Sequence, residues 1–317
     1  MRASALPVLL LLATACGERP DRATSKPVTI GFSQAGAESA WRTAETRSIL
    51  DEAKSRGMVV KFADAQGDPE KQQQALRSFL LQRVDAILLA PIVETGFEPV
   101  LREVRAAKIP VVLVDRGVRV ADEGLYATLI AADFVAEGRA AAAWLAQRLG
   151  GNARIAELQG TTGSSPALDR ARGFAEELAK YPGMKVVKSQ SGDFTRARGK
   201  EVMEAFLKAE DPAQPFTAVY AHNDDMALGA IQAIEAAGRK PGQDLVVVSI
   251  DGVRGAFEAM VRGQLDATVE CSPLLGPLAL DAVQQILAGR PVARRHVVPL
   301  RVFPKEQAAA ELPNRRY

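Results

Sequence analysis

Polar side chains that suit a small polar ligand stand directly after several strand-like apolar runs of this 317-residue chain. Asp115 and Arg116 follow the run VVLV, and Asp251 follows LVVVSI. A carboxylate accepts two hydroxyl hydrogen bonds and a guanidinium donates from a rigid fork, so both groups match the adjacent hydroxyls of a sugar. The alternative for Asp115 and Arg116 is a local surface ion pair worth at most about 1 kcal/mol. These residues by themselves leave both interpretations open.

Asn223, Asp224 and Asp225 stand between a strand-like run and a helix-like run in FTAVYAHNDDMALGAI (216–231). An amide there caps the free N–H groups of a first helical turn, or it faces a ligand at the carboxyl end of a parallel strand. Both roles stay open for Asn223. Asp224 and Asp225 are interpreted as structural, because the helix dipole favours negative charge in the first turn.

Aromatic residues make up only 5% of the chain, which makes their positions informative. Trp41 lies in GAESAWR beside Glu38 and Arg42, and Phe194 lies in SGDFTR after a strand-like run. The C–H faces of a sugar ring pack well on aromatic faces, and an indole adds one hydrogen-bond donor. The alternative for both residues is that they fill gaps in the core.

Short β-branched runs alternate with longer helix-like segments from Val28 onward. This alternation predicts an α/β fold with parallel sheets covered by helices on both faces. We expect helices over 71–83 and 226–238, and strands over 28–33, 58–63, 85–90, 110–115, 153–158, 185–190, 216–221 and 245–251. Two groups of such units, about 28–130 and 132–271, both carry polar residues at their strand ends. Two lobes facing each other across these loops would form one cleft.

Composition and missing motifs exclude several classes of function. Net charge is +2 with Lys and Arg dispersed, and no helix-turn-helix or zinc spacing indicates nucleic-acid binding. Two histidines leave little material for a metal site or a catalytic triad. The loop GTTGSS (160–165) lacks the Lys of a phosphate-binding loop, and no GxSxG or HExxH occurs. We therefore expect no metal, no cofactor and no catalysis.

The first sixteen residues, MRASALPVLLLLATAC, have the features of a targeting segment. Ala13-Thr14-Ala15 suits ordinary signal peptidase, whereas Leu12 to Cys16 resembles a bacterial lipobox in which Cys16 carries lipid; the second alternative is favoured. Residues 17–27 would then form a polar tether. Cys271, the other thiol, has no intrachain partner and is expected to be a buried small residue.

These features together resemble the periplasmic sugar-binding proteins of bacterial ABC importers, in the ribose-binding branch and nearest to its galactofuranose-binding members. The resemblance spans about 28–300 and rests on GFSQAGAESAWRTAE, VVLVDRG, LQGTTGSSPALDRARGF, SQSGDFTRARGKEVMEAF, YAHNDDMALGAIQAI and SIDGV. It implies the type I periplasmic binding protein fold: two Rossmann-like lobes, joined by a three-stranded hinge, that close over one sugar without catalysing a reaction. It also implies hinge crossings near 131–132, 271–272 and 296–298. The lobes would then be 28–131 plus 272–296 and 132–271 plus 297–317.

The resemblance also implies a ligand set drawn from both lobes. The first lobe would contribute Glu38, Trp41, Arg42, Asp115 and Arg116, and the second would contribute Arg170, Phe194, Asn223 and Asp251. Ribose binders carry Asn-Pro-Phe-Phe where this chain has Glu38-Ser39-Ala40-Trp41, and a Gln where it has Cys271. These departures argue against ribose itself.

The predicted function is the extracytoplasmic binding component of a sugar ABC importer. It would bind a monosaccharide, galactofuranose or a similar furanose or pentose, and deliver it to the membrane permease subunits. We expect an exported, periplasmic monomer that touches the membrane only through a lipid on Cys16. The alternative is a sensory module for a chemotaxis or histidine-kinase receptor. A repressor of the same fold would need a helix-turn-helix at the N-terminus, and a hydrolase would need general bases that the chain lacks.

Overall fold

The computed structural model describes residues 26–317. The predicted targeting segment, Cys16 and nearly all of the predicted tether lie outside the described residues. Processing and lipidation at Cys16 therefore stay predictions.

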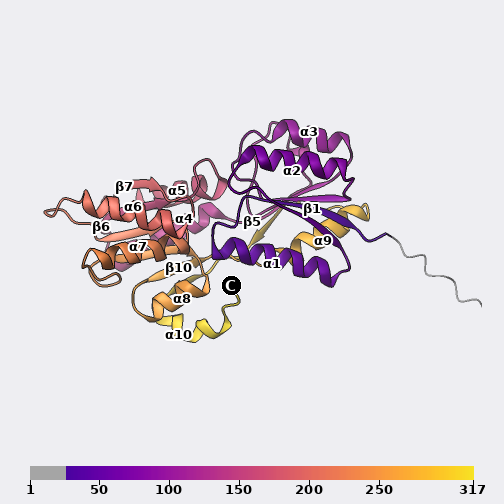
Figure 1. Ribbon diagram of the computed structural model, residues 1–317. Helices are drawn as coiled ribbons and strands as arrows, with labels where there is room; N and C mark the ends of the chain where they lie inside the picture. Colours follow the sequence, from indigo (N-terminus) through magenta and orange to yellow (C-terminus); the bar gives the residue numbers. More distant parts are fainter. Residues whose placement is uncertain (1–25) are drawn as a thin grey trace, which may run out of the picture.

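A six-stranded parallel sheet forms the centre of the first lobe, which is drawn mostly in indigo and purple in Figure 1. Its strands lie in the order β11-β5-β4-β3-β1-β2. Their bounds are β1 Thr29–Gln34, β2 Val59–Asp64, β3 Ala86–Leu89, β4 Val111–Val114, β5 Thr128–Ala132 and β11 Arg295–Val298. Every residue of AILL in β3 and VVLV in β4 is buried, as expected for central strands covered on both faces.

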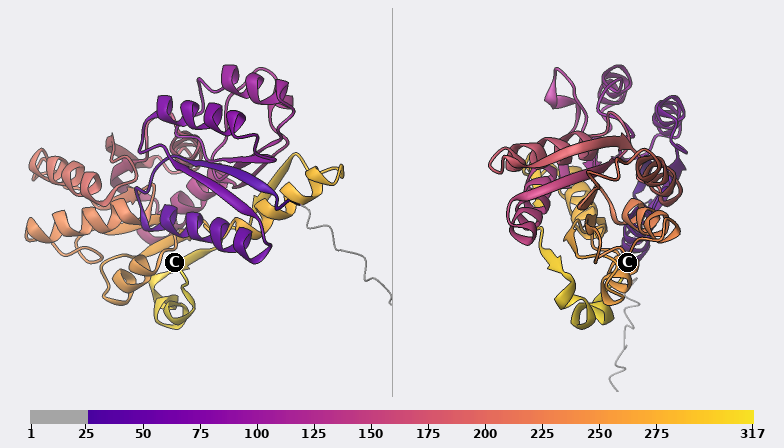
Figure 2. Two further views of the ribbon diagram at one scale, coloured as in Figure 1. Left: turned by 45° about the vertical axis from the view of Figure 1, so that its right-hand side comes forward. Right: turned by 90° about the vertical axis from the view of Figure 1, so that its left-hand side faces the viewer.

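Four helices cover this sheet: α1 Ala40–Ser55, α2 Pro69–Leu81, α3 Glu98–Ala106 and α9 Gly276–Leu287. Helices α1 and α9 pack on each other over one face, where Ile49 and Leu280 belong to the same buried cluster. Helices α2 and α3 cover the other face through Leu76, Phe79 and Leu101. Figure 2 shows the gold helix α9 within the first lobe although it lies far along the chain, and it contacts α1, β3, β4 and β5. A short 3-10 helix, η1 Glu123–Leu125, precedes β5.

The second lobe repeats this plan with one strand reversed. Its sheet has the order β12-β10-β9-β8-β6-β7, and only β12 runs antiparallel to its neighbour. The strands are β6 Asn152–Gln159, β7 Gly183–Ser191, β8 Ala218–Ala221, β9 Val246–Asp251, β10 Ala267–Glu270 and β12 Val302–Pro304. The helices are α4 Phe134–Leu149, α5 Ser165–Leu178, α6 Arg196–Lys208, α7 Asp224–Ala236, α8 Arg254–Val261 and α10 Ala308–Glu311, with the short 3-10 helices η2 Lys305–Gln307 and η3 Leu312–Asn314.

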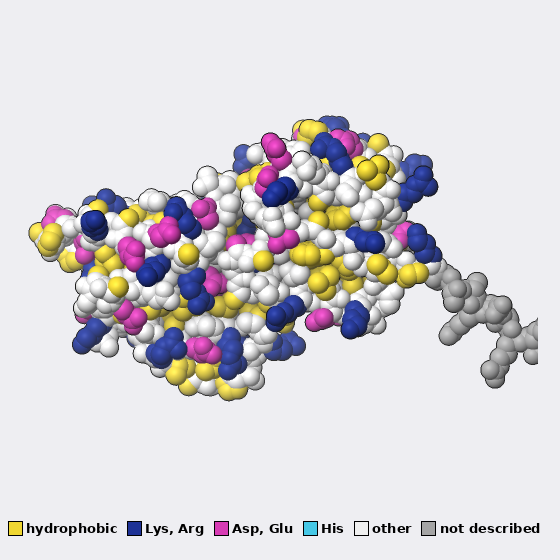
Figure 3. All heavy atoms as spheres, in the orientation of Figure 1, with side chains coloured by type: hydrophobic (Ala, Val, Ile, Leu, Met, Phe, Trp, Pro, Cys, Tyr) yellow, Lys and Arg dark blue, Asp and Glu magenta, His cyan; other side chains and the backbone are white. Residues whose placement is uncertain are grey.

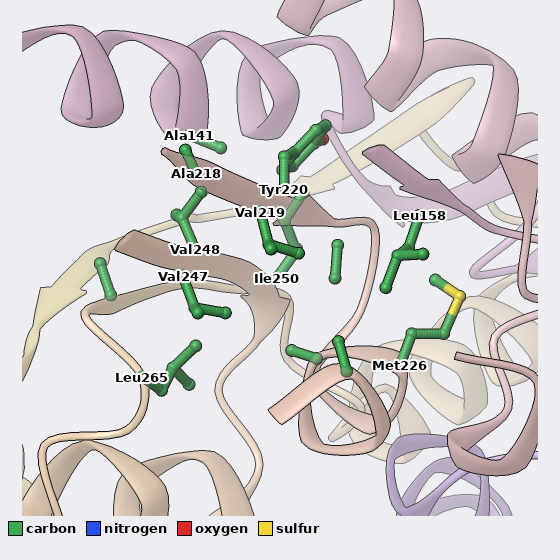
Figure 4. Close-up of a cluster of buried hydrophobic side chains, with 14 of the residues drawn as sticks. Ala141, Leu158, Ala218, Val219, Tyr220, Met226, Val247, Val248, Ile250 and Leu265 are labelled. Carbon is green, nitrogen blue, oxygen red and sulfur yellow. The ribbon is translucent and has the colours of Figure 1, made fainter. Parts of the chain in front are cut away.

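The core of the second lobe is continuous across its sheet. Figure 4 shows Tyr220 and Ala141 on one side of β8, and Val247 and Leu265 on the other. Because successive strand residues point to opposite faces, a strand with helices on both sides needs an unbroken apolar run. The run Ala218–Ala221 meets this requirement, since all four residues are buried.

The eight predicted strands are all present, and each end lies within two residues of its predicted position. The two predicted helices begin two residues earlier than expected, at Pro69 and Asp224, because Asp68 and Asn223 cap them. Four strands were not predicted: β5, β10, β11 and β12. They are short, and β11 and β12 are edge strands whose sequences lack a clear apolar run.

The chain passes three times between the two sheets. It leaves the first sheet after β5, returns between β10 and α9, and leaves again between Val298 and Val302. The predicted lobe boundary between residues 296 and 297 falls within β11, whose pairing with β5 continues to Val298.

Charges of both signs are interspersed over the face of the molecule shown in Figure 3, without a large single-sign patch. Among the described residues, no helix is both long enough and apolar enough to cross a bilayer.

Candidate functional site

The nine residues predicted to bind ligand all line one cavity between the lobes. The loop after β1 carries Glu38 and leads into α1 with Trp41 and Arg42, and the loop after β4 carries Asp115 and Arg116. From the second lobe come Arg170 on α5, Phe194 after β7, Asn223 after β8 and Asp251 at the end of β9. The empty space among these side chains is about 290 Å³, part of it open to solvent.

Arg42 is the centre of the first-lobe half of the site. Its guanidinium contacts Glu45 at 2.5 Å, Asp115 at 2.7 Å and Glu38 at 3.2 Å. Arg116 donates to the same Glu38 oxygen at 3.2 Å and to the Ile92 carbonyl at 3.3 Å. A ligand in the cavity therefore meets carboxylates and guanidinium groups that already hold one another in place, and little ordering is required when it binds.

The first-lobe cluster contains more acids than bases. Three carboxyl groups (Glu38, Glu45 and Asp115) face two guanidinium groups, and all five side chains have little exposure. Burial raises the pKa of Glu45 to about 7, because Arg42 compensates only partly and Asp115 adds negative charge. Burial alone would also raise the pKa of Glu38, but Arg42 and Arg116 outweigh it and lower that pKa. Of the three carboxyl groups, Glu45 is thus the one that keeps its proton most readily, and it lies behind the cavity wall.

Arg170 occupies the matching position in the second lobe. Its Nε donates to Glu137 at 2.8 Å, its Nη1 donates to the His222 carbonyl at 2.7 Å, and its Nη2 lies 3.8 Å from Asp251. Burial raises the pKa of Asp251 well above its usual value; Arg170 opposes this, and Asp224 and Glu137 add to it. Asp251 also has a φ of 133°, a strained conformation for a residue with a side chain. Strain of this kind at a strand end is typical of ligand sites.

Trp41 and Phe194 have different surroundings in the cavity. The indole Nε1 of Trp41 donates to the Cys271 carbonyl at 2.5 Å, so its one donor is used within the protein. Trp41 therefore offers a ligand its ring face and not the N–H that the sequence allowed for. The ring of Phe194, whose φ is 60°, lies against Gly160, and the Arg116 guanidinium lies 5.3 Å from the ring centre.

Asn223 caps α7 with its side chain as well as lining the cavity. Its Oδ1 accepts from the Met226 N–H at 2.9 Å, and its Nδ2 donates to the Phe194 carbonyl at 3.0 Å. The side chain thus combines the two roles that the sequence left open for it. Because each polar end of the amide already has one protein partner, the second N–H and the second lone pair of Oδ1 remain for a ligand.

Three further residues line the cavity: Ser39, Pro166 and Cys271. Cys271 is buried, as predicted, and occupies the connection between β10 and α9. Glu45 and Glu137 stand behind the arginines and were not identified from sequence. The spacing of Arg42 and Glu45 on one helix face was a usable signal, whereas nothing in the sequence relates Glu137 to Arg170.

The two aspartates that follow Asn223 are structural, as predicted, but in different ways. Asp224 is fully buried and accepts from the N–H groups of Gly252 and Val253 and from two hydroxyl groups. Asp225 is buried and accepts from the Ala40 N–H of the other lobe at 2.8 Å. His222 is buried and its Nε2 lies 3.1 Å from Glu157, so it packs within the second lobe and does not face the cavity.

Comparison with known proteins gives consistent matches over most of the chain. Residues 30–291 match the model of a family described as the periplasmic binding protein domain. The galactofuranose-binding protein YtfQ of Escherichia coli is 48% identical over 278 residues, which is 87% of each chain.

Two solved structures are also similar. The binding protein of the arabinose ABC transporter of Shewanella, bound to α- and β-L-arabinofuranose, has a TM-score of 0.89 and 54% identity, covering 91% of this chain and 95% of its own. A protein of Mycobacterium smegmatis in complex with β-D-fucofuranose has a TM-score of 0.88 and 50% identity, covering 92% and 95%.

Proposed function

The chain belongs to the periplasmic binding protein domain family, and from this we propose that it is the extracytoplasmic component of a sugar ABC importer that binds a furanose. Its two-lobed fold is that of type I periplasmic binding proteins, and its role is to bind a ligand rather than to catalyse a reaction. The relatives named above bind galactofuranose, arabinofuranose and fucofuranose. The single observation that carries the proposal is that all nine predicted side chains line one cavity between the lobes.

We propose that Asp115 and Asp251 accept hydroxyl hydrogen bonds while Arg42, Arg116 and Arg170 donate to ring and hydroxyl oxygens. Trp41 and Phe194 would pack on the apolar faces of the sugar, and Glu38 and the free N–H of Asn223 would complete its polar contacts. Groups of both signs suit a neutral polyol, which accepts and donates at each hydroxyl. A charged ligand would leave one set of these groups unsatisfied.

Binding would favour the closed arrangement of the lobes because only that arrangement brings the two half-sites together. We propose the lobes that the sequence predicts, 28–131 plus 272–296 and 132–271 plus 297–317, with the last boundary moved to the end of β11 at Val298. The closed form would then dock on the permease subunits of the importer.

Family membership implies an exported, periplasmic protein. We propose further that Cys16 carries the lipid that anchors it, and that the protein acts as a monomer. The lipobox-like stretch from Leu12 to Cys16 supports the first point, and a cavity lined by residues of one chain supports the second.

The test is a thermal-shift panel of monosaccharides on the purified mature chain, followed by calorimetry on the best ligand. A ligand at a hundredfold excess over its Kd stabilises the fold by about 2.7 kcal/mol, which raises Tm measurably. Anhydro alditols, whose ring size is fixed, then show whether the protein prefers a furanose or a pyranose ring. We expect the 1,4-anhydro alditol, with its five-membered ring, to bind more tightly than its 1,5-anhydro isomer. The opposite order of affinities would contradict a preference for the furanose ring. No change in Tm with any sugar would contradict sugar binding.

A further inference from the structure

A second, larger cavity lies next to the sugar cavity and is also lined by both lobes. It holds about 1,090 Å³ of empty space open to solvent, compared with about 290 Å³ in the first. Its first-lobe walls follow β1, β2 and β3, at Gly36, Asp64 and Ile92, and its second-lobe walls follow β6 and β7, at Thr161 and Asp193. It therefore lies over the same carboxyl ends of strands as the sugar cavity, where α/β folds bind ligands.

The two cavities share a wall formed by Glu38 and Arg116. Glu38 is the least tightly held carboxylate of the first-lobe cluster: its two arginine contacts are 3.2 Å long, compared with 2.5 Å and 2.7 Å for Glu45 and Asp115. It is also the most exposed, with 18% of its side chain accessible against 0% and 6%. The wall between the two cavities is thus formed in part by the most exposed and least tightly paired carboxylate of the cluster.

Groups that can hydrogen-bond to a polyol line the second cavity. Among the described residues, the Thr161 hydroxyl makes no side-chain hydrogen bond, and the second oxygen of Asp193 accepts no hydrogen bond but lies 4.0 Å from the Arg198 guanidinium. The lining itself contains three carboxylates (Glu38, Asp64 and Asp193) and one guanidinium, Arg116, which is paired with Glu38. Like charge repels an anion from this space, so a phosphate or a nucleotide is disfavoured and a neutral group is accepted.

We propose that this second cavity is a subsite for the aglycone of a furanoside, a neutral sugar unit or polyol attached to the furanose in the first cavity. The inference rests on the proposed furanose binding. It extends the ligand range from a free monosaccharide to a furanosyl disaccharide, whose glycosidic bond passes the wall where Glu38 stands. Small residues on the first-lobe side, Gly36 and Gly67, keep the space beside this wall open.

The experiment compares free sugar, disaccharide and charged glycoside by titration calorimetry on the full mature chain. The probes are L-arabinose, α-1,5-L-arabinobiose and α-L-arabinofuranosyl phosphate, or the matching galactofuranose series if arabinose does not bind. We expect the disaccharide to bind within about tenfold of the free sugar, a difference of about 1.4 kcal/mol or less, and the phosphate to bind much more weakly. A disaccharide weaker by more than tenfold would overturn the subsite while leaving monosaccharide binding intact. If neither free sugar binds, the proposed function itself fails.

Two conservative variants locate the aglycone. Thr161→Val removes one hydroxyl without changing size, and Asp193→Asn removes one charge while keeping a residue that tolerates the observed φ of 53°. Neither residue lines the first cavity. We expect each variant to lower the affinity for the disaccharide at least threefold and to leave the affinity for the free sugar unchanged. Asp193→Asn should also reduce the difference in affinity between the disaccharide and the phosphate. Unchanged disaccharide affinity in both variants would place the aglycone elsewhere and overturn the proposal.

Discussion

The Asp225 carboxylate accepts a hydrogen bond from the backbone N–H of Ala40 across the cleft between the two lobes, at 2.8 Å. Ala40 is the first residue of α1, a helix that has no acidic residue in its own first turn. The second lobe therefore supplies the negative charge that the helix dipole favours. The other Asp225 oxygen is held by Arg196 at 2.8 Å. In two further hydrogen bonds the first lobe also donates and the second lobe accepts: Gly117 N–H donates to the Ser165 hydroxyl, and Glu94 N–H donates to the Gly163 carbonyl.

Asp225→Ala should weaken sugar binding without removing any group that lines the sugar cavity. Separating the lobes breaks the bond to Ala40, so the bond stabilises the closed form, and a charge-assisted hydrogen bond contributes about 1.5 kcal/mol or more. We expect roughly a tenfold loss of affinity, seen mainly as faster sugar dissociation in stopped-flow fluorescence. Arg196→Ala is the control, because it removes the partner of Asp225 within the second lobe and leaves the bond across the cleft. Equal affinities in wild type and Asp225→Ala would show that this bond does not stabilise closure.

Asn223→Ala should lower the stability of the unliganded protein as well as its sugar affinity. The variant removes the cap on the Met226 N–H, which costs about 1–2 kcal/mol, and leaves the Phe194 carbonyl without its donor. Urea unfolding without ligand measures the first effect. Asn223→Asp is the comparison variant, since its carboxylate keeps the cap but loses the donor to the Phe194 carbonyl and adds a negative charge. An unchanged unfolding midpoint in Asn223→Ala would show that the cap contributes little.

Gly160→Ala should displace the Phe194 ring. A Cβ at Gly160 would lie 1.9 Å from the ring, so the ring must move, and overpacking of this kind costs about 1–3 kcal/mol. We expect both Tm and sugar affinity to fall. Adding Phe194→Leu should restore Tm, because the smaller side chain relieves the clash, but not affinity, because the aromatic face is lost. Full recovery of sugar affinity in the double variant would show that the Phe194 ring does not contact the sugar.

Glu45→Gln should change how stability depends on pH. Burial raises the pKa of Glu45 from 4.5 to about 7, so between these values the folded protein keeps a proton that the unfolded chain releases. The free energy of unfolding should therefore fall as pH rises through this window, by up to about 3 kcal/mol from this group. Glutamine cannot ionise, so the variant should lose this fall.

Urea unfolding at several pH values between 4.5 and 8 measures the effect. The control is Glu70→Gln, at an exposed site on α2, which should keep the wild-type slope. A Glu45→Gln slope that matches wild type would mean that Glu45 stays ionised throughout this range.

Much of the fold could be predicted because its signals are local. Runs such as AILL and VVLV identify strands buried on both faces, and apolar residues at helical spacing identify the two predicted helices, whose starts fell two residues inside the observed ones. Strands β11 and β12 could not be predicted in this way. They are edge strands with exposed or mixed residues, and pairing with a neighbour defines them more than their own sequence does.

The amino-acid sequence by itself determined the alternation of strands and helices, and therefore the polar groups that stand at strand ends. Parallel strands place their carboxyl ends at one edge of a sheet. The polar residues around Asp115 and Asp251 therefore meet in one cleft once the two sheets face each other. Only the tertiary structure decided which groups pair. Arg170 with Glu137, Trp41 with the Cys271 carbonyl and Asp225 with Ala40 join positions 33, 230 and 185 residues apart. The first pair depends on how α4 packs on α5, and the third depends on how the lobes close, so no short stretch of sequence contains that geometry.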